Sequence, residues 1–95
     1  MKDCSLIFDK QKQDSSDVGL LMLHGLAGMP CEFKRVGEAL QGRGVVVYAP
    51  MLAGHCQSGE ELAKATWRDW SAGVEEAFES FSQRCSTIFV GGLCL

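Results

Sequence analysis

The chain has 95 residues and a mass of 10.3 kDa, which suits one small domain with a single core. Hydrophobic residues make up 46% and charged residues 22%, a composition that excludes a disordered chain. A net charge of −3 and a pI near 5.2 give no basic surface for nucleic acid or anionic lipid. No apolar run approaches the about 20 residues of a membrane span, and no signal-peptide core is present.

The first third of the chain predicts two strands separated by a polar turn. Residues 4–8 form a short apolar stretch typical of an edge strand, and residues 10–17 (KQKQDSSD) are predicted to be a turn. Residues 18–23 (VGLLML) are apolar without alternation, which indicates a strand buried on both faces of a parallel sheet. Residues 24–30 (HGLAGMP) contain two glycines and a proline and are predicted to be a sharply bent loop.

A helix is predicted to follow this loop, beginning at Pro30. Phe33, Val36 and Leu40 recur at helical spacing and predict one apolar stripe. Gly42 is expected to end the helix in a left-handed conformation.

The second half repeats the order strand, loop, helix, strand. Residues 45–49 (VVVYA) predict a second buried strand, residues 51–59 a loop, and residues 60–65 a helical turn. Thr66 and Asp69 have the spacing of a capping box at the start of a long amphipathic helix. Its apolar face, in which both tryptophans are assigned to the core, consists of Trp67, Trp70, Val74, Ala77, Phe78 and Phe81. A third strand is predicted over residues 87–90.

Strands that alternate with helices of this length predict right-handed crossovers and a mostly parallel sheet covered on both faces. The expected fold class is therefore α/β, a three-layer sandwich.

The five cysteines predict neither a metal site nor a disulfide framework. They contain no CxxC pair and no zinc-ligand spacing, so no metal site is expected. No other cofactor is expected either, since Gly25 and Gly28 do not form a GxGxxG phosphate loop. Their odd number without a secretion signal indicates reduced thiols and a cytoplasmic protein. Four of them, Cys4, Cys31, Cys56 and Cys85, are interpreted as small buried hydrophobic residues.

Three loops rich in small residues leave the carboxyl ends of the predicted parallel strands, where ligands bind in open α/β sheets. The third is the most informative, because Gly92-Leu93-Cys94-Leu95 follows a strand and matches the start of a Gly-x-nucleophile-x-Gly elbow. Cysteine stands where serine is usual, and the final glycine position of the motif comes after Leu95.

The ordered motifs VGLLMLHGLAGMP, YAPMLAGH, TWRDW and IFVGGLCL resemble the α/β-hydrolase family, in particular its bacterial carboxylesterases and monoacylglycerol lipases. The resemblance covers residues 18–95 and corresponds to the N-terminal half of that fold. It implies a nucleophilic Cys94 and an oxyanion hole formed by the backbone N–H groups of Leu26 and Leu95. His24, Gly25 and Gly92 are implied to shape the loops.

The chain departs from the family pattern at three positions. Cys94 replaces serine, Ala53 replaces a proline, and Cys56 replaces a glycine after His55. A cysteine in the elbow also resembles dienelactone hydrolases and polyhydroxyalkanoate synthases. The resemblance assigns His24 and His55 to structural loops rather than to the general base, and Asp69 is interpreted as a helix cap rather than the triad acid.

The expected domain is a partial α/β-hydrolase unit over residues 1–95 that stops just after the elbow. The resemblance implies a small-molecule ester or thioester substrate, and the triad acid and histidine would lie later in the sequence. The isolated chain is therefore predicted to be inactive. Two alternatives stay open: a degenerate hydrolase that acts only as a partner of another polypeptide, and a flavodoxin-like binding module. An incomplete sheet would also favour self-association.

Overall fold

A computed structural model describes residues 3–9 and 18–93. The turn predicted over residues 10–17 therefore lies outside the described residues. The elements, in chain order, are β1 (Leu6–Phe8), β2 (Val18–Leu23), the 3-10 helix η1 (Pro30–Phe33), α1 (Lys34–Gln41), β3 (Val46–Ala49), α2 (Gly59–Lys64), α3 (Trp67–Ser82) and β4 (Thr87–Gly92).

The four strands form one sheet in the order β1-β3-β2-β4. β2 lies in the middle and pairs in parallel with both β3 and β4, while the short β1 pairs antiparallel with β3. The pairing of β2 with β4 runs from Val18 opposite Thr87 to Leu23 opposite Gly92. The sheet is thus mostly parallel, as the continuous apolar runs of its strands predict.

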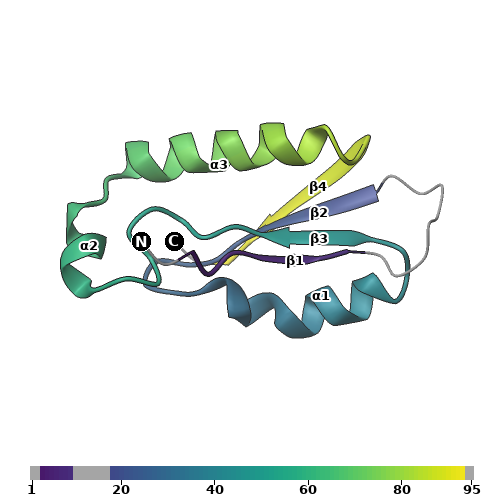
Figure 1. The fold of residues 1–95 in the computed structure, drawn as a ribbon, viewed down its shortest axis with the longest axis horizontal. Coiled ribbons are helices and arrows are strands. Elements are labelled where there is room, and N and C mark those ends of the chain that lie inside the picture. Colours follow the sequence, from purple (N-terminus) through teal and green to yellow (C-terminus); the bar gives the residue numbers. More distant parts are fainter. Residues whose placement is uncertain (1–2, 10–17, 94–95) are drawn as a thin grey trace.

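Helices cover both faces of this sheet. Figure 1 shows α3 on one side and α1 on the other, with the strands between them. The structure therefore confirms the predicted α/β class and its three layers. α2 lies beyond the end of the sheet, beside the loops that leave the carboxyl ends of the strands.

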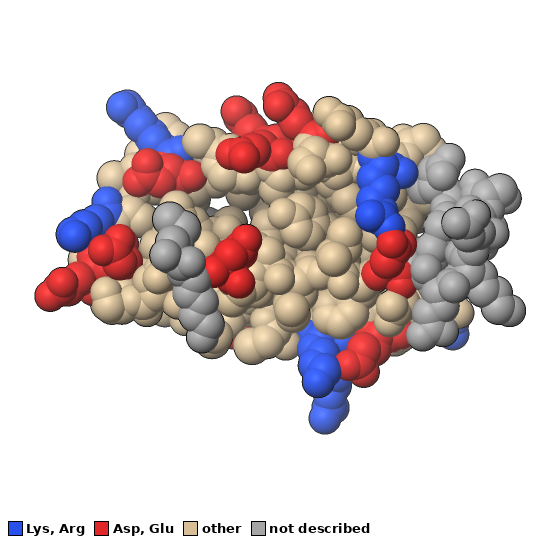
Figure 2. Space-filling view, viewed as in Figure 1, with Lys and Arg blue, Asp and Glu red and all other residues tan. Residues whose placement is uncertain are grey.

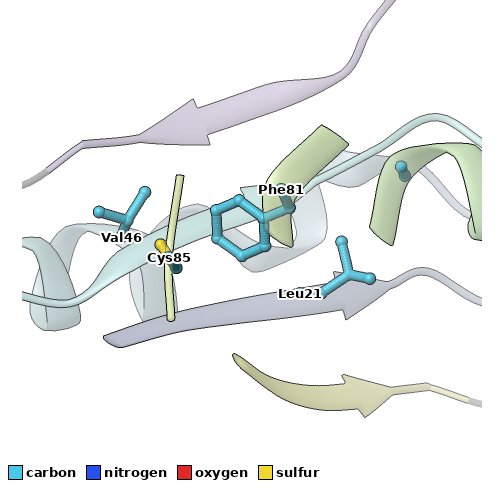
Figure 3. Packing of buried hydrophobic residues seen from close by; sticks show 5 residues of the cluster. Leu21, Val46, Phe81 and Cys85 are labelled. Atoms are coloured by element: carbon cyan, nitrogen blue, oxygen red, sulfur yellow. The ribbon is translucent and has the colours of Figure 1, made fainter. Parts of the chain in front are cut away.

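The core under α3 is built around Phe81. The buried residues that pack together there come from both central strands, from α3 and from the turn after it; they are Leu21, Val46, Ala77, Phe81 and Cys85 (Figure 3). Gly19 lies directly beneath the ring, since a Cβ at this position would come within 2.6 Å of Phe81 Cζ. The absence of a side chain at Gly19 lets α3 approach the sheet.

A Gly19→Ala substitution is expected to lower the free energy of unfolding by about 1–3 kcal/mol, because the added methyl overpacks Phe81 and Cys85. The matched control is Gly73→Ala within α3, where a Cβ meets no described atom within 4 Å. That control should stabilise the helix by about 1 kcal/mol. Urea unfolding of both variants measures the difference, and equal effects of the two alanines would contradict the close approach.

On the opposite face, the structure corrects the predicted stripe of the first helix. Phe33 is buried as expected, but it belongs to η1, and Val36 is exposed. The buried position of α1 is Gly37, whose backbone lies against the ring of Phe8 from β1. Phe8 thus occupies the space that a side chain on α1 would otherwise fill.

The end of α1 also differs from its prediction. Gly42 keeps a right-handed conformation with φ of −67°, whereas Gly44 has φ of +82°. The N–H groups of Gly44 and Val45 donate to the carbonyls of Gln41 and Leu40. The left-handed residue therefore comes two positions later, after an extra turn of the chain.

The capping box of α3 is present as predicted. The Thr66 hydroxyl accepts from the N–H of Asp69, and the Asp69 carboxylate accepts from the N–H of Thr66 at 2.8 Å. The assignment of both tryptophans to the core is wrong for Trp67, which is 66% exposed. Trp70 is half-buried, and its indole N–H donates to the carbonyl of Ala53. Phe78, also predicted on the apolar face, is exposed rather than buried.

The outer surface of α3 is acidic. Acidic side chains gather over this helix in the view of Figure 2, whereas lysines and arginines lie toward the periphery. The acidic residues of α3 are Asp69, Glu75, Glu76 and Glu79. This face of the molecule therefore carries no basic patch.

The cysteines depart most from expectation. Cys4 and Cys56 form a disulfide with a Cα–Cα distance of 6.4 Å, so the prediction that both are separate reduced thiols is wrong. Cys31 is exposed rather than buried, while Cys85 is buried as predicted. The two cysteines are 52 residues apart in sequence and meet only because β1 pairs antiparallel with β3.

Candidate functional site

The loops that follow the three parallel strands share one edge of the sheet. Leu23 at the end of β2 pairs with Gly92, and the N–H of Leu93 donates to the carbonyl of Leu23 at 3.0 Å. The loop that begins at His24 therefore starts beside the residue that precedes position 94. The loop after β3, residues 50–58, lies on the other side of β2.

His24 and His55 join the loops after β2 and β3 by reciprocal hydrogen bonds. His24 Nε2 accepts from the N–H of Leu52 at 3.1 Å, and His55 Nε2 accepts from the N–H of Ala27 at 3.0 Å. The two rings meet edge to face with centroids 4.6 Å apart, and the residues are 1% and 2% exposed. We call this pair of side chains the histidine clasp.

The hydrogen bonds define the protonation of both rings. Since each Nε2 accepts from a backbone amide, each Nδ1 carries the proton and donates to a carbonyl. The acceptors are Gly25 O for His24 at 2.9 Å and Ala53 O for His55 at 3.1 Å. Burial lowers the pKa of His24, opposed by the bond to Gly25 and reinforced by the charge that His55 can carry. The clasp is thus a structure of the neutral imidazole.

α3 supports the clasp from its outer side. The indole N–H of Trp70 donates to the same Ala53 carbonyl at 3.0 Å, and the Trp70 ring meets the His55 ring at 6.0 Å. The loop after β3 is consequently held from the strand edge and from the helix at once.

Both loops contain a residue in the left-handed region that is not glycine. Ala27 has φ of +62° and Cys56 has φ of +61°. Ala27 is the third residue of a tight turn that the Gly28 N–H closes on the Gly25 carbonyl at 2.8 Å, as in a type II turn. At Cys56, the family resemblance expects glycine, and the left-handed backbone gives the physical reason for that preference.

Three of the predicted loop residues can be located. Gly25 is buried, while Leu26 is exposed at the tip of the turn and is followed by two hydrogen-bonded amides, those of Ala27 and Gly28. A Cβ at Gly92 would make ordinary contacts with Leu23, whereas one at Gly91 would come within 2.9 Å of the Met22 sulfur. Of these two neighbouring glycines, Gly91 is therefore the more crowded. Cys94 and Leu95 lie outside the described residues.

A mainly apolar cavity of about 370 Å³ opens beside the end of β4. Its lining comes from the ends of β2 and β4, the two loops and the first turns of α3, and includes Leu23, His24, Leu52, Trp70, Val74 and Leu93. The cavity thus adjoins both the histidine clasp and the residue before position 94.

The family resemblance predicts His24 and His55 to be structural loop residues, but it does not predict that each bonds to the other's loop. The available signal was that each histidine begins or follows a turn at the carboxyl end of a neighbouring parallel strand. Asp69 takes part in the capping box, as predicted.

Within residues 3–9 and 18–93, no group of three or more histidine, cysteine or acidic side chains is placed to hold a metal ion. No helix in this part of the chain has the length and apolar character needed to cross a membrane.

Comparison with known proteins gives consistent relatives. No family model matches the chain. It is 39% identical over 82 residues to a thermostable monoacylglycerol lipase from a Bacillus species, covering 86% of this chain and 33% of that protein. It is 32% identical over 80 residues to a carboxylesterase from Bacillus subtilis, covering 83% of this chain and 32% of that protein.

A solved structure reported with LipS and LipT, two metagenome-derived lipolytic enzymes, gives a TM-score of 0.82 at 30% identity. The match covers 94% of this chain and 34% of the solved chain. The chain thus spans about a third of the length of the relatives it matches. Motifs, sheet order and relatives agree, and the chain belongs to the α/β-hydrolase family, among its esterase- and lipase-like members.

Proposed function

We propose that these 95 residues carry the nucleophile and the oxyanion hole of an enzyme that cleaves carboxylic esters or thioesters. Cys94 is the proposed nucleophile, and the N–H groups of Leu26 and Leu95 are the proposed oxyanion donors. The observation that carries the proposal is the bond from the Leu93 N–H to the Leu23 carbonyl, which brings Leu93, the residue before Cys94 in sequence, beside the start of the loop that contains Leu26. The lipase and carboxylesterase relatives support the substrate class.

In the proposed reaction, the Cys94 thiolate attacks the acyl carbon and forms a carbon–sulfur bond. The carbonyl oxygen gains negative charge, which two preorganised N–H donors stabilise. The tetrahedral intermediate then expels the alcohol or thiol and leaves an acyl thioester on Cys94. Water attacks this thioester, releases the carboxylic acid and regenerates the thiol.

The histidine clasp supports this arrangement by fixing the amide of Ala27, the residue after Leu26. Ala27 donates to His55, and Gly28 donates to Gly25, so the turn that carries Leu26 has one defined orientation. Both ring nitrogens of His24 and His55 are bonded to backbone groups, and these are the two histidines of the chain. We therefore place the general base outside these 95 residues and expect the isolated chain not to turn over substrate.

Acylation by p-nitrophenyl butyrate tests the proposal. The chain should release about one p-nitrophenolate per molecule without further turnover, with one butyryl group on Cys94 by mass spectrometry. Cys94 should acylate at least about tenfold faster than an ordinary exposed thiol, because oxyanion donors lower the barrier. Cys31→Ala, which removes an exposed thiol, is the matched control and should leave the burst unchanged.

Two results would contradict parts of the proposal. An equal burst from Cys94→Ala would exclude Cys94 as the nucleophile. Sustained turnover by the chain that disappears in Cys94→Ala would instead support Cys94 as the nucleophile and would exclude a general base outside these 95 residues.

A second function is a non-catalytic partner of another polypeptide. It is favoured by β4, an edge of the described sheet, where Phe89 and Val90 are both exposed. Absence of any acylation at Cys94 together with concentration-dependent association in analytical ultracentrifugation would support this function over the first.

A further inference from the structure

The disulfide joins the segment before β1 to the loop after β3. The antiparallel register of β1 with β3 places Leu6 opposite Ala49, so the chain before Leu6 runs beside the chain after Ala49. The N–H of Met51 donates to the Ser5 hydroxyl at 2.7 Å, next to the Cys4–Cys56 bond. One hydrogen bond and one disulfide therefore connect the two segments.

Cys56 directly follows His55, the residue that holds the turn after β2. The Ala27 N–H donates to His55 Nε2, so a displacement of Cys56 moves the acceptor of this bond. Cys56 also has φ of +61°, a left-handed conformation that is unfavourable for a residue with a side chain. Without the covalent link, this backbone has an intrinsic tendency to leave its position.

We propose that Cys4 and Cys56 form a thiol–disulfide switch that exchanges with low-molecular-weight thiols and disulfides and sets the order of the turn at Leu26 and Ala27. When oxidised, the pair holds the loop after β3 against β1 and keeps His55 in the clasp. When reduced, the loop loses this link, Cys56 relaxes, and the Ala27–His55 bond opens more often. A change in the order of this turn would alter ester cleavage only if the proposed function holds, whereas the switch itself does not depend on that function.

The exchange with a disulfide such as oxidised glutathione balances in two steps. One cysteine thiolate attacks a glutathione sulfur, forms a mixed disulfide and releases the first glutathione thiolate. The other cysteine thiolate then attacks the protein sulfur of the mixed disulfide and releases the second. Two electrons and two protons pass from the cysteine pair to glutathione, and two molecules of reduced glutathione result.

Hydrogen exchange in oxidised and reduced glutathione buffers tests the switch on the full chain without any substrate. We expect peptide mapping to find the Cys4–Cys56 link in the oxidised buffer and both thiols in the reduced one. Protection of the Ala27 amide should fall at least about tenfold on reduction, while the Leu21 amide in the central strand changes less. Because no substrate is present, failure of this test is independent of failure of the proposed function.

Variants separate the link from its neighbours. Cys4→Ser and Cys56→Ser should both hold Ala27 at the reduced level of protection in either buffer. Cys31→Ser, the matched control for an exposed thiol, should keep the full redox response. Cys56→Gly accepts the left-handed backbone and should show protection that is the same in both buffers. Free thiols at Cys4 and Cys56 in the oxidised buffer, a link to another cysteine, or equal Ala27 protection in both forms would overturn the proposal.

Discussion

Phe81→Ala is expected to lower the free energy of unfolding by about 3–5 kcal/mol. The Phe81 ring is 3% exposed and lies between α3 and the sheet, where it contacts Gly19 and packs against Tyr48 with ring centroids 5.7 Å apart. Gly19 has no side chain that could move into the space, so the cavity would persist. Since a domain of this size is stabilised by only about 5–15 kcal/mol, the loss removes a large part of the total.

Phe78→Ala is the matched control on the same helix. Phe78 is 43% exposed, so its truncation should cost less than about 1.5 kcal/mol. Urea unfolding followed by circular dichroism measures both variants. Similar losses from the two alanines would show that the core is not centred on Phe81.

His24→Leu is expected to lower the free energy of unfolding by about 2–4 kcal/mol. Leucine fills much of the buried volume but leaves the Leu52 N–H and the Gly25 carbonyl without their partner, and each buried unpaired group costs about 1–3 kcal/mol. His24→Gln places an amide oxygen near the position of Nε2 and should recover part of the loss. A neutral effect of leucine would exclude a structural role for the clasp.

The same variant should remove a pH dependence. Burial holds the pKa of His24 below its ordinary value of 6.5, although the hydrogen bond to the Gly25 carbonyl acts in the opposite direction. The folded chain therefore binds a proton at His24 less readily than the unfolded chain does. The stability contributed by neutral His24 is complete above about pH 6.5 and is lost as the pH falls through 6.5 toward the lowered pKa. Unfolding curves between pH 5 and 8 should slope in the wild type and be flatter in His24→Leu.

Local patterns predict the elements of this chain well. The apolar run of residues 18–23, the capping pair Thr66 and Asp69, and the alternation of strands with helices each identify their element, because periodicity and capping act over a few residues. The family could also be predicted, since the elbow and loop motifs occur in order. The predicted cytoplasmic location stays a prediction.

Burial within an element is less predictable. Val36 and Trp67 occupy apolar positions of their helices but are exposed, whereas Gly37 is buried because Phe8 packs on the helix backbone. The spacing of apolar residues identifies a face of a helix, yet the neighbour that meets this face comes from another part of the chain. For Phe8 and Gly37, that neighbour is the first strand.

The α/β class and the hydrolase-type order of motifs follow from the sequence alone. The bonds of His24 and His55 to each other's loops and the link between Cys4 and Cys56 are visible only in the folded chain. Both contacts join residues that sheet register brings together, and register is a property of several strands at once. The helices and strands of this chain follow from local patterns, whereas its candidate site depends on contacts between loops at the shared edge of the parallel strands.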